Sequence, residues 1–135
     1  MNFAKTAYLE KKLLDQVLLG EAFTPPAVVY LALFTADPGR SGSLANEIAD
    51  PAYERQEIAF TAAADDLESG SFCQNAYDIE FPQAATNWGT VTHAAIMDAA
   101  TGGNALYVVA LDTAKEITAE DFIKFPAGTF VIKED

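Results

Sequence analysis

The apolar positions at the beginning of the chain follow the period of a helix. Between residues 3 and 19 they recur every three or four residues, which is the spacing of one face of an α-helix. Asn2 is of a residue type that caps helix N-termini, and Gly20 is of the type that ends helices. The pattern predicts a helix over this range, in an N-terminal docking segment of residues 1–23. Its apolar surface is wider than one contact needs, so we expect it to dock in a groove of its own domain or on a neighbouring subunit.

Beyond the Thr24-Pro25-Pro26 stop, the apolar positions follow the period of β-strands. Short segments rich in β-branched and aromatic residues alternate with Pro, Gly and Asp turn signals. A loop from Pro38 to Ala52 is the longest stretch without a strand pattern and a candidate functional surface. No βαβ spacing is present, so the fold class is all-β: a single-domain β-sandwich over residues 27–135, preceded by the helix. The seven predicted strands cover residues 28–34, 57–61, 72–81, 89–98, 104–111, 122–125 and 129–133.

Several predicted strands are apolar on both faces. Residues 106–111 read Leu-Tyr-Val-Val-Ala-Leu, so neither face of that strand is polar. A two-layer sandwich buries only one face of each sheet, and the second face then needs a cover. We expect the N-terminal helix or another chain to supply it, which favours an oligomer.

Composition narrows the class of partner. Twenty acidic residues against eight basic ones leave a net charge of −12, and such a surface repels the phosphate backbone of DNA or RNA. The longest apolar stretch, Ala27 to Phe34, is far shorter than the ~20 residues of a membrane-spanning helix. We therefore expect no nucleic acid and no membrane among the partners.

The residue types that carry chemistry are sparse. The chain has one cysteine, Cys73, and one histidine, His93, which cannot supply a tetrahedral zinc site or an obvious nucleophile–base pair. Cys73 is either a packed thiol or an intersubunit cross-link. The acidic segment around Asp65 fits a solvated loop better than a calcium loop. The sequence predicts no catalytic residues, no metal and no cofactor.

Two other function classes stay open at this point. The aromatic residues Trp88, Tyr53 and Tyr77 are candidates for a platform that binds sugars. Any two of the twenty carboxylates are candidates for the acid–base pair of a hydrolase. Exposure of Trp88 is what separates a sugar platform from ordinary core packing.

Several segments, taken in order, resemble a family of small structural proteins of tailed bacteriophages that are often labelled tail fibre-like or minor tail proteins. The similarity extends from Tyr30 to Ile132, with the N-terminal helix in the expected place, although Ile48-Ala49-Asp50-Pro51-Ala52 replaces an expected glycine-rich stretch. The segments that carry it are Tyr30-Leu31-Ala32-Leu33-Phe34-Thr35-Ala36-Asp37-Pro38-Gly39, Tyr53-Glu54-Arg55-Gln56, Ile79-Glu80-Phe81-Pro82, Asn87-Trp88-Gly89-Thr90-Val91-Thr92-His93, Ile96-Met97-Asp98-Ala99-Ala100-Thr101-Gly102-Gly103-Asn104-Ala105-Leu106-Tyr107 and Phe125-Pro126-Ala127-Gly128.

The resemblance implies a non-enzymatic virion subunit of the tail, the neck or collar, or a fibre, located in the host cytoplasm before assembly. It implies docking on other virion structural proteins. From the strands that are apolar on both faces we expect a homo-oligomer, a trimer, hexamer or multiple. A capsid decoration or head-fibre protein and a carbohydrate-binding tip module are the alternatives. The residues that we expect at interfaces are Phe3, Leu13, Leu14, Val17, Arg40, Arg55, Trp88 and Tyr107.

Overall fold

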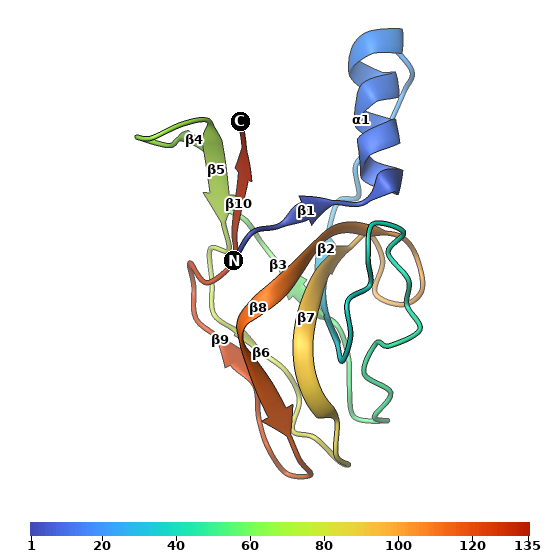
Figure 1. Cartoon of the computed structure of the whole chain (residues 1–135), viewed down its shortest axis with the longest axis vertical. Helices are drawn as coiled ribbons and strands as arrows, with labels where there is room; N and C mark the ends of the chain where they lie inside the picture. Colours follow the sequence, from blue (N-terminus) through green and yellow to red (C-terminus); the bar gives the residue numbers. More distant parts are fainter.

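A five-stranded antiparallel sheet forms the centre of the fold (Figure 1). The computed structural model describes residues 1–135. The two longest strands form a hairpin at the middle of this sheet, and they are rich in the β-branched and apolar residues that favour strands. The strand order is β1 (Ala4–Lys5), β8 (Ala105–Ile117), β7 (Gly89–Met97), β2 (Val29–Phe34) and β3 (Gln56–Ile58).

Two small antiparallel sheets complete the strand content of the molecule. One has the order β10 (Val131–Glu134), β5 (Ser71–Gln74) and β4 (Ala64–Asp65), and the other pairs β6 (Ile79–Glu80) with β9 (Lys124–Phe125). The prediction of an all-β fold with one N-terminal helix is confirmed. No helix is both long enough and apolar enough to span a membrane.

The main hydrophobic core lies on the side of the large sheet that faces the small sheets. Leu31 and Leu33 of β2 belong to one buried cluster of 17 residues together with Phe81, Phe125 and Phe130 from the second half of the chain. The rings of Phe125 and Phe130 approach to 4.9 Å between centroids. Long-range packing of these aromatics therefore joins the large sheet to the two small ones.

The opposite face of the large sheet is also buried, and the chain covers it by itself. A second cluster joins Ala32 and Phe34 of β2 with residues of β7 and β8, and Leu44 packs against it. Leu44 belongs to the segment of residues 35–55, here called the covering loop. A Cβ atom on Gly42 would lie 2.9 Å from the Cβ of Ala105, so glycine lets the loop approach the sheet. The expectation that the helix or another chain covers this face is wrong, because the loop does so.

The helix α1 spans Ala7–Leu19 and begins four residues later than predicted. Thr6, not Asn2, is the N-cap, and its hydroxyl accepts a hydrogen bond from the backbone N–H of Leu9 at 3.3 Å. Residues 4 and 5 form β1, since they pair with β8. The end of the helix is as predicted, with Gly20 as the C-cap. Apolar spacing alone did not reveal the pairing of β1, which depends on a strand a hundred residues away.

Two strand predictions also differ from the structure. The predicted strand over residues 72–81 divides into β5 and β6 because the buried side chain of Asn75 makes a corner. Its Nδ2 donates to the carbonyls of Tyr77 and Pro126, both at 3.0 Å, and its Oδ1 accepts from the N–H of Phe130 at 2.8 Å. β8 continues to Ile117, beyond the predicted end at residue 111, because its polar half still pairs with β7.

Candidate docking surface

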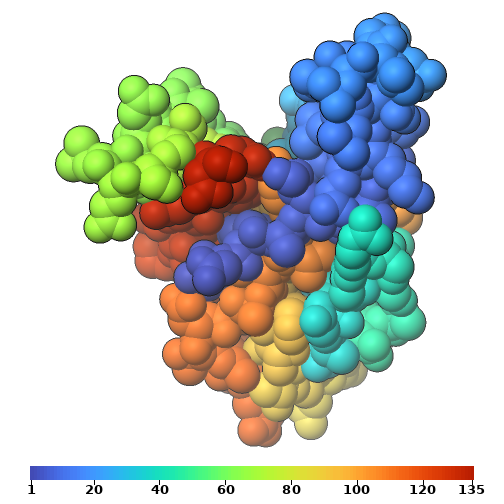
Figure 2. All heavy atoms as spheres, turned by 45° about the horizontal axis from the view of Figure 1, so that its top comes forward, coloured from blue at the N-terminus to red at the C-terminus, as the bar shows by residue number.

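The helix α1 projects from the body of the molecule, and only its first turns rest on the sheet (Figures 1 and 2). Leu9 is its one buried residue. The hydroxyl of Thr6 donates to the carbonyl of Ala105 at 2.6 Å, which ties the start of the helix to β8. The covering loop holds the same end, since the carbonyl of Arg40 accepts from the N–H of Ala7 at 2.9 Å and its guanidinium lies 2.8 Å from Glu10. The base of the helix is therefore anchored while the rest extends into solvent.

The projecting part of α1 exposes large apolar side chains. Leu14, Val17 and Leu18 are 57%, 74% and 72% exposed, and their spacing of three and four residues places them on one face of the helix. Together with Leu13, Lys5 and Glu10 they line an open groove along the helix. Figure 2 shows a notch between α1, in blue, and the green and red end of the small sheet of β4, β5 and β10. Residues 13, 14, 17 and 18 are called the apolar face of α1 below.

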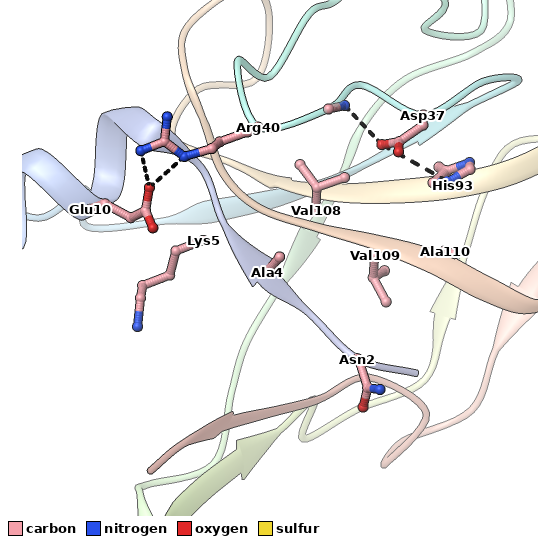
Figure 3. Close-up of a pocket in the computed structure, with 11 residues that line it drawn as sticks. Asn2, Ala4, Lys5, Glu10, Asp37, Arg40, His93, Val108, Val109 and Ala110 are labelled. Carbon is pink, nitrogen blue, oxygen red and sulfur yellow. Dashed lines mark hydrogen bonds and ion pairs between the residues drawn. The ribbon is translucent and has the colours of Figure 1, made fainter.

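A pocket lined by both charged and apolar residues lies at the base of the helix (Figure 3). The Nε2 atom of His93 is 4.0 Å from Oδ1 of Asp37, which itself accepts a hydrogen bond from the N–H of Gly39 at 2.8 Å. The other ring nitrogen of His93 lies 2.7 Å from the hydroxyl of Thr92. A distance of 4.0 Å is too long for a hydrogen bond, so Asp37 does not orient the imidazole as the carboxylate of a catalytic triad does.

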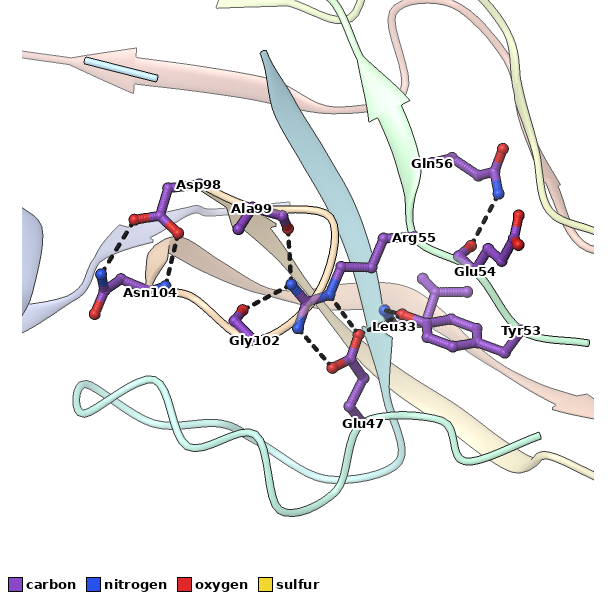
Figure 4. A network of polar contacts seen from close by, with 10 residues as sticks. All are labelled: Leu33, Glu47, Tyr53, Glu54, Arg55, Gln56, Asp98, Ala99, Gly102 and Asn104. Carbon is purple, nitrogen blue, oxygen red and sulfur yellow. Dashed lines mark hydrogen bonds and ion pairs between the residues drawn. The ribbon is translucent and has the colours of Figure 1, made fainter. Parts of the chain in front are cut away.

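Arg55 is a structural residue at the centre of a polar network inside the domain (Figure 4). Its guanidinium makes two hydrogen bonds of 2.8 Å to the two carboxylate oxygens of Glu47, and it donates to the carbonyls of Ala99 and Gly102, also at 2.8 Å. These contacts fasten the covering loop to the turn between β7 and β8. The hydrogen bond to Glu47 raises the pKa of Arg55, so the guanidinium stays charged.

The hydroxyl of Tyr53 also belongs to this network. Its hydroxyl donates to Oε2 of Glu47 at 2.7 Å and accepts from the N–H of Leu33 at 3.0 Å. Burial, followed by the charge of Glu47, raises the pKa of Tyr53 far above its ordinary value. The ring stacks on Phe81 with an interplanar angle of 8°, so this tyrosine is a packing residue and not part of an exposed platform.

Trp88 is buried beside Asp50. The residue is 7% exposed, and its indole N–H donates to Oδ2 of Asp50 at 2.9 Å. The carboxylate of Asp50 also accepts from the N–H groups of Ala52 and Thr86, both at 2.6 Å, and from the Thr86 hydroxyl. Burial raises the pKa of Asp50, but the hydrogen bonds outweigh it and lower the pKa to about 2. Trp88 is therefore too buried to form the centre of a sugar-binding platform.

The eight residues expected at interfaces fall into three groups. Leu13, Leu14 and Val17 lie together on α1, with Arg40 at the base of the helix. Phe3 and Tyr107 are half-buried and pack edge to face where β1 meets β8, with ring centroids 6.5 Å apart. Arg55 and Trp88 lie inside the domain. Leu18 completes the exposed face, and its position four residues after Leu14 is the signal that identifies it.

The remaining candidates for chemistry have ordinary structural partners. Asp66, in the acidic segment, pairs with Nζ of Lys133 at 2.6 Å, and the hydrogen bond from Lys133 lowers the pKa of Asp66. Cys73 is half-buried on β5, and burial raises the pKa of its thiol. Neither group lies beside the apolar face of α1.

A family model described as Podophage GP4 fiber I protein gp80 matches residues 4–133. The chain belongs to this family. The match spans both α1 and the strands, and it confirms the resemblance to a family of phage tail fibre-like structural proteins. No curated protein sequence matches the chain. Membership in the gp80 family assigns the chain to the structural proteins of bacteriophages.

Proposed function

We propose that this gp80-family chain is a non-enzymatic subunit of a tailed-phage virion, which acts by associating with other virion proteins. The observation that carries the proposal is the apolar face of α1. Leu14, Val17 and Leu18 are more than half exposed, together on one face of a helix that projects from the body of the molecule. An exposed apolar face of this kind is typical of a surface that another protein covers.

The interior of the domain supports an architectural role. The buried polar groups of Arg55, Asp50 and Asn75 all hold loops or corners of the fold in place. Every buried side-chain nitrogen and oxygen has a hydrogen-bond partner. Polar networks in which every buried group has a hydrogen-bond partner make a domain rigid, which suits a structural subunit. The same subunit collects in the host cytoplasm before assembly, where its net charge of −12 keeps it soluble.

The experiment is quantitative mass spectrometry of purified phage particles that carry the gene. We expect the chain in a fixed ratio to the major capsid protein, in a copy number that is a multiple of three or six, after the particles are washed in high salt. A matched preparation of proteins from lysed cells serves as the background. Absence of the chain from washed particles, or a copy number that varies between preparations, contradicts the proposal.

A further inference from the structure

The net charge of the chain is confined to the body and does not extend to the helix. Residues 1–23 contain three basic and three acidic side chains, whereas residues 24–135 contain five basic and seventeen acidic ones. The whole excess of −12 therefore belongs to the body. A basic partner would be attracted to the body, and the bodies of two copies repel each other. The helix projects from the body and lies in a segment without net charge, so two copies can associate through it without this repulsion.

The helix α1 packs little of its surface against its own domain, and its exposed leucines therefore have no partner within the chain. It has 13 residues, and Leu9 is the only one that is buried. Isolated helices of this length are marginal in water, and most helices in proteins are stabilised by packing of an apolar face. The apolar face of α1 would receive that packing from a second protein surface.

The width of the apolar face indicates more than one neighbour. Leu13 and Leu18 mark its margins, which lie about 140° apart around the helix axis at 100° per residue. A two-stranded coiled coil needs a narrower seam, and a wider stripe is typical of helices that face the core of a bundle. A helix of 13 residues is also only about 20 Å long, so a single helix pair buries little area compared with a stable interface.

We infer that the apolar face of α1 packs against the same face of at least two further copies of this chain. The helices form a parallel bundle around a rotation axis, because closed rings of identical subunits are the usual symmetric assemblies, and three or more helices that lie along such an axis stay parallel under the rotation. The acidic bodies then lie outside the bundle. This inference deepens the proposed function, on which it rests, because it names the partner of α1.

The test uses Val17 and Leu19, which have nearly equal exposure, 74% and 71%. They point in directions about 160° apart, and only Val17 belongs to the apolar face, near its middle. Two full-length variants carry Val17→Cys or Leu19→Cys, each with Cys73→Ala so that the new cysteine is the only thiol. Because these positions are exposed, neither substitution disturbs the core. The variants are oxidised with copper phenanthroline at equal concentration and separated on a non-reducing gel.

In a parallel bundle a residue near the middle of the face approaches the same residue of another copy at the axis, where Cα atoms come within the ~4.4–6.8 Å that a disulfide spans. We expect most of the Val17→Cys variant to form a disulfide-linked dimer, at a rate at least fivefold above that of Leu19→Cys. Equal rates at the two positions, or no cross-link at residue 17, overturn the inference. Binding of the uncross-linked Val17→Cys variant to phosphatidylcholine vesicles would assign the face to lipid and also overturn it.

The outcome is separable from that of the particle experiment. If the chain occurs in washed particles at constant copy number but residue 17 does not cross-link, the virion role stands and the partner of α1 is another protein. If residue 17 cross-links but the chain is absent from particles, the bundle stands and the virion role fails.

Discussion

Arg55 and Glu47 form a two-pronged ion pair inside the domain, with both carboxylate oxygens 2.8 Å from guanidinium nitrogens. The side chain of Arg55 is 3% exposed and that of Glu47 is 16% exposed. Since Arg55 also holds the carbonyls of Ala99 and Gly102, one side chain joins the covering loop to the β7–β8 turn. This contact closes the second face of the sheet without any partner chain.

Replacement of Arg55 by methionine removes these bonds and leaves the partly buried carboxylate of Glu47 unpaired. Breaking a buried pair in this way costs about 3–5 kcal/mol in the free energy of unfolding, measured by urea denaturation. Arg40→Met is the matched control, because the pair of Arg40 with Glu10 is exposed and is worth about 0–1 kcal/mol. Equal losses in the two variants would contradict the structural role assigned to Arg55.

Asp50→Asn lowers stability at neutral pH, because an amide offers one acceptor oxygen where the carboxylate accepts four hydrogen bonds. The pKa of Asp50 is lowered from 3.8 to about 2 in the folded chain. The stabilisation by the charged form is therefore complete above the unfolded pKa and is lost as pH falls from about 4 to 2. We expect the difference in unfolding free energy between wild type and variant to be constant from pH 7 to 5 and to shrink below pH 4.

The fluorescence of Trp88, the single tryptophan, follows this unfolding because its indole contacts Asp50. Asp65→Asn is the control, since Asp65 is exposed. A difference for Asp50→Asn that stays the same down to pH 2 would mean that the carboxylate is not held in its charged form.

Gly103→Ala and Gly102→Ala separate backbone strain from crowding in the β7–β8 turn. Both glycines have positive φ, at 71° and 59°, so both substitutions cost about 1–2 kcal/mol in strain. A Cβ on Gly103 would also collide with the carboxylate of Asp98 and lie 2.8 Å from the Cβ of Ala99, whereas Gly102 has open space. We expect Gly103→Ala to be less stable than Gly102→Ala by about 1–3 kcal/mol in thermal or urea unfolding. A smaller loss at Gly103 would show that the turn is not packed as described.

Salt strengthens the assembly if copies meet through α1. The acidic bodies repel one another at low ionic strength, and the Debye length falls from about 10 Å at 0.1 M to about 3 Å at 1 M salt. We expect the dissociation constant of the oligomer to fall about tenfold or more between 0.05 and 0.5 M sodium chloride, measured by sedimentation. Weaker association at higher salt would indicate an ionic contact, such as the basic residues at the helix base against the acidic body of another copy.

The sequence predicts the parts of the fold that depend on local pattern. The end of α1 at Gly20, the strand β2 and the glycine turn before β8 follow from residues within a few positions of each other. The beginning of α1 and the corner at Asn75 could not be predicted, because they depend on pairing and packing with segments far along the chain. The resemblance indicated the family without showing which surface is used.

The segment that covers the second face of the sheet also could not be predicted from the sequence. Apolar strands on both faces indicated a missing cover, but the pattern could not show that Leu44 and the small residues Ala32 and Ala105 bring the loop onto the sheet. The exposed face of α1 was predicted as a docking surface from helical spacing, and the structure shows that Leu14, Val17 and Leu18 are uncovered. The uncovered apolar surface therefore lies on the helix and not on this face of the sheet.

The most direct measurement is the mass of the full-length chain in solution, by light scattering under reducing conditions over a range of micromolar concentrations. We expect at least three times the mass of one chain for the wild type. We expect the mass of one chain for Val17→Glu, which places a charge near the middle of the apolar face, and an unchanged oligomer for the Leu19→Glu control. A wild-type chain that remains monomeric at the highest concentration, or a Val17→Glu variant that assembles as the wild type does, would contradict association through α1.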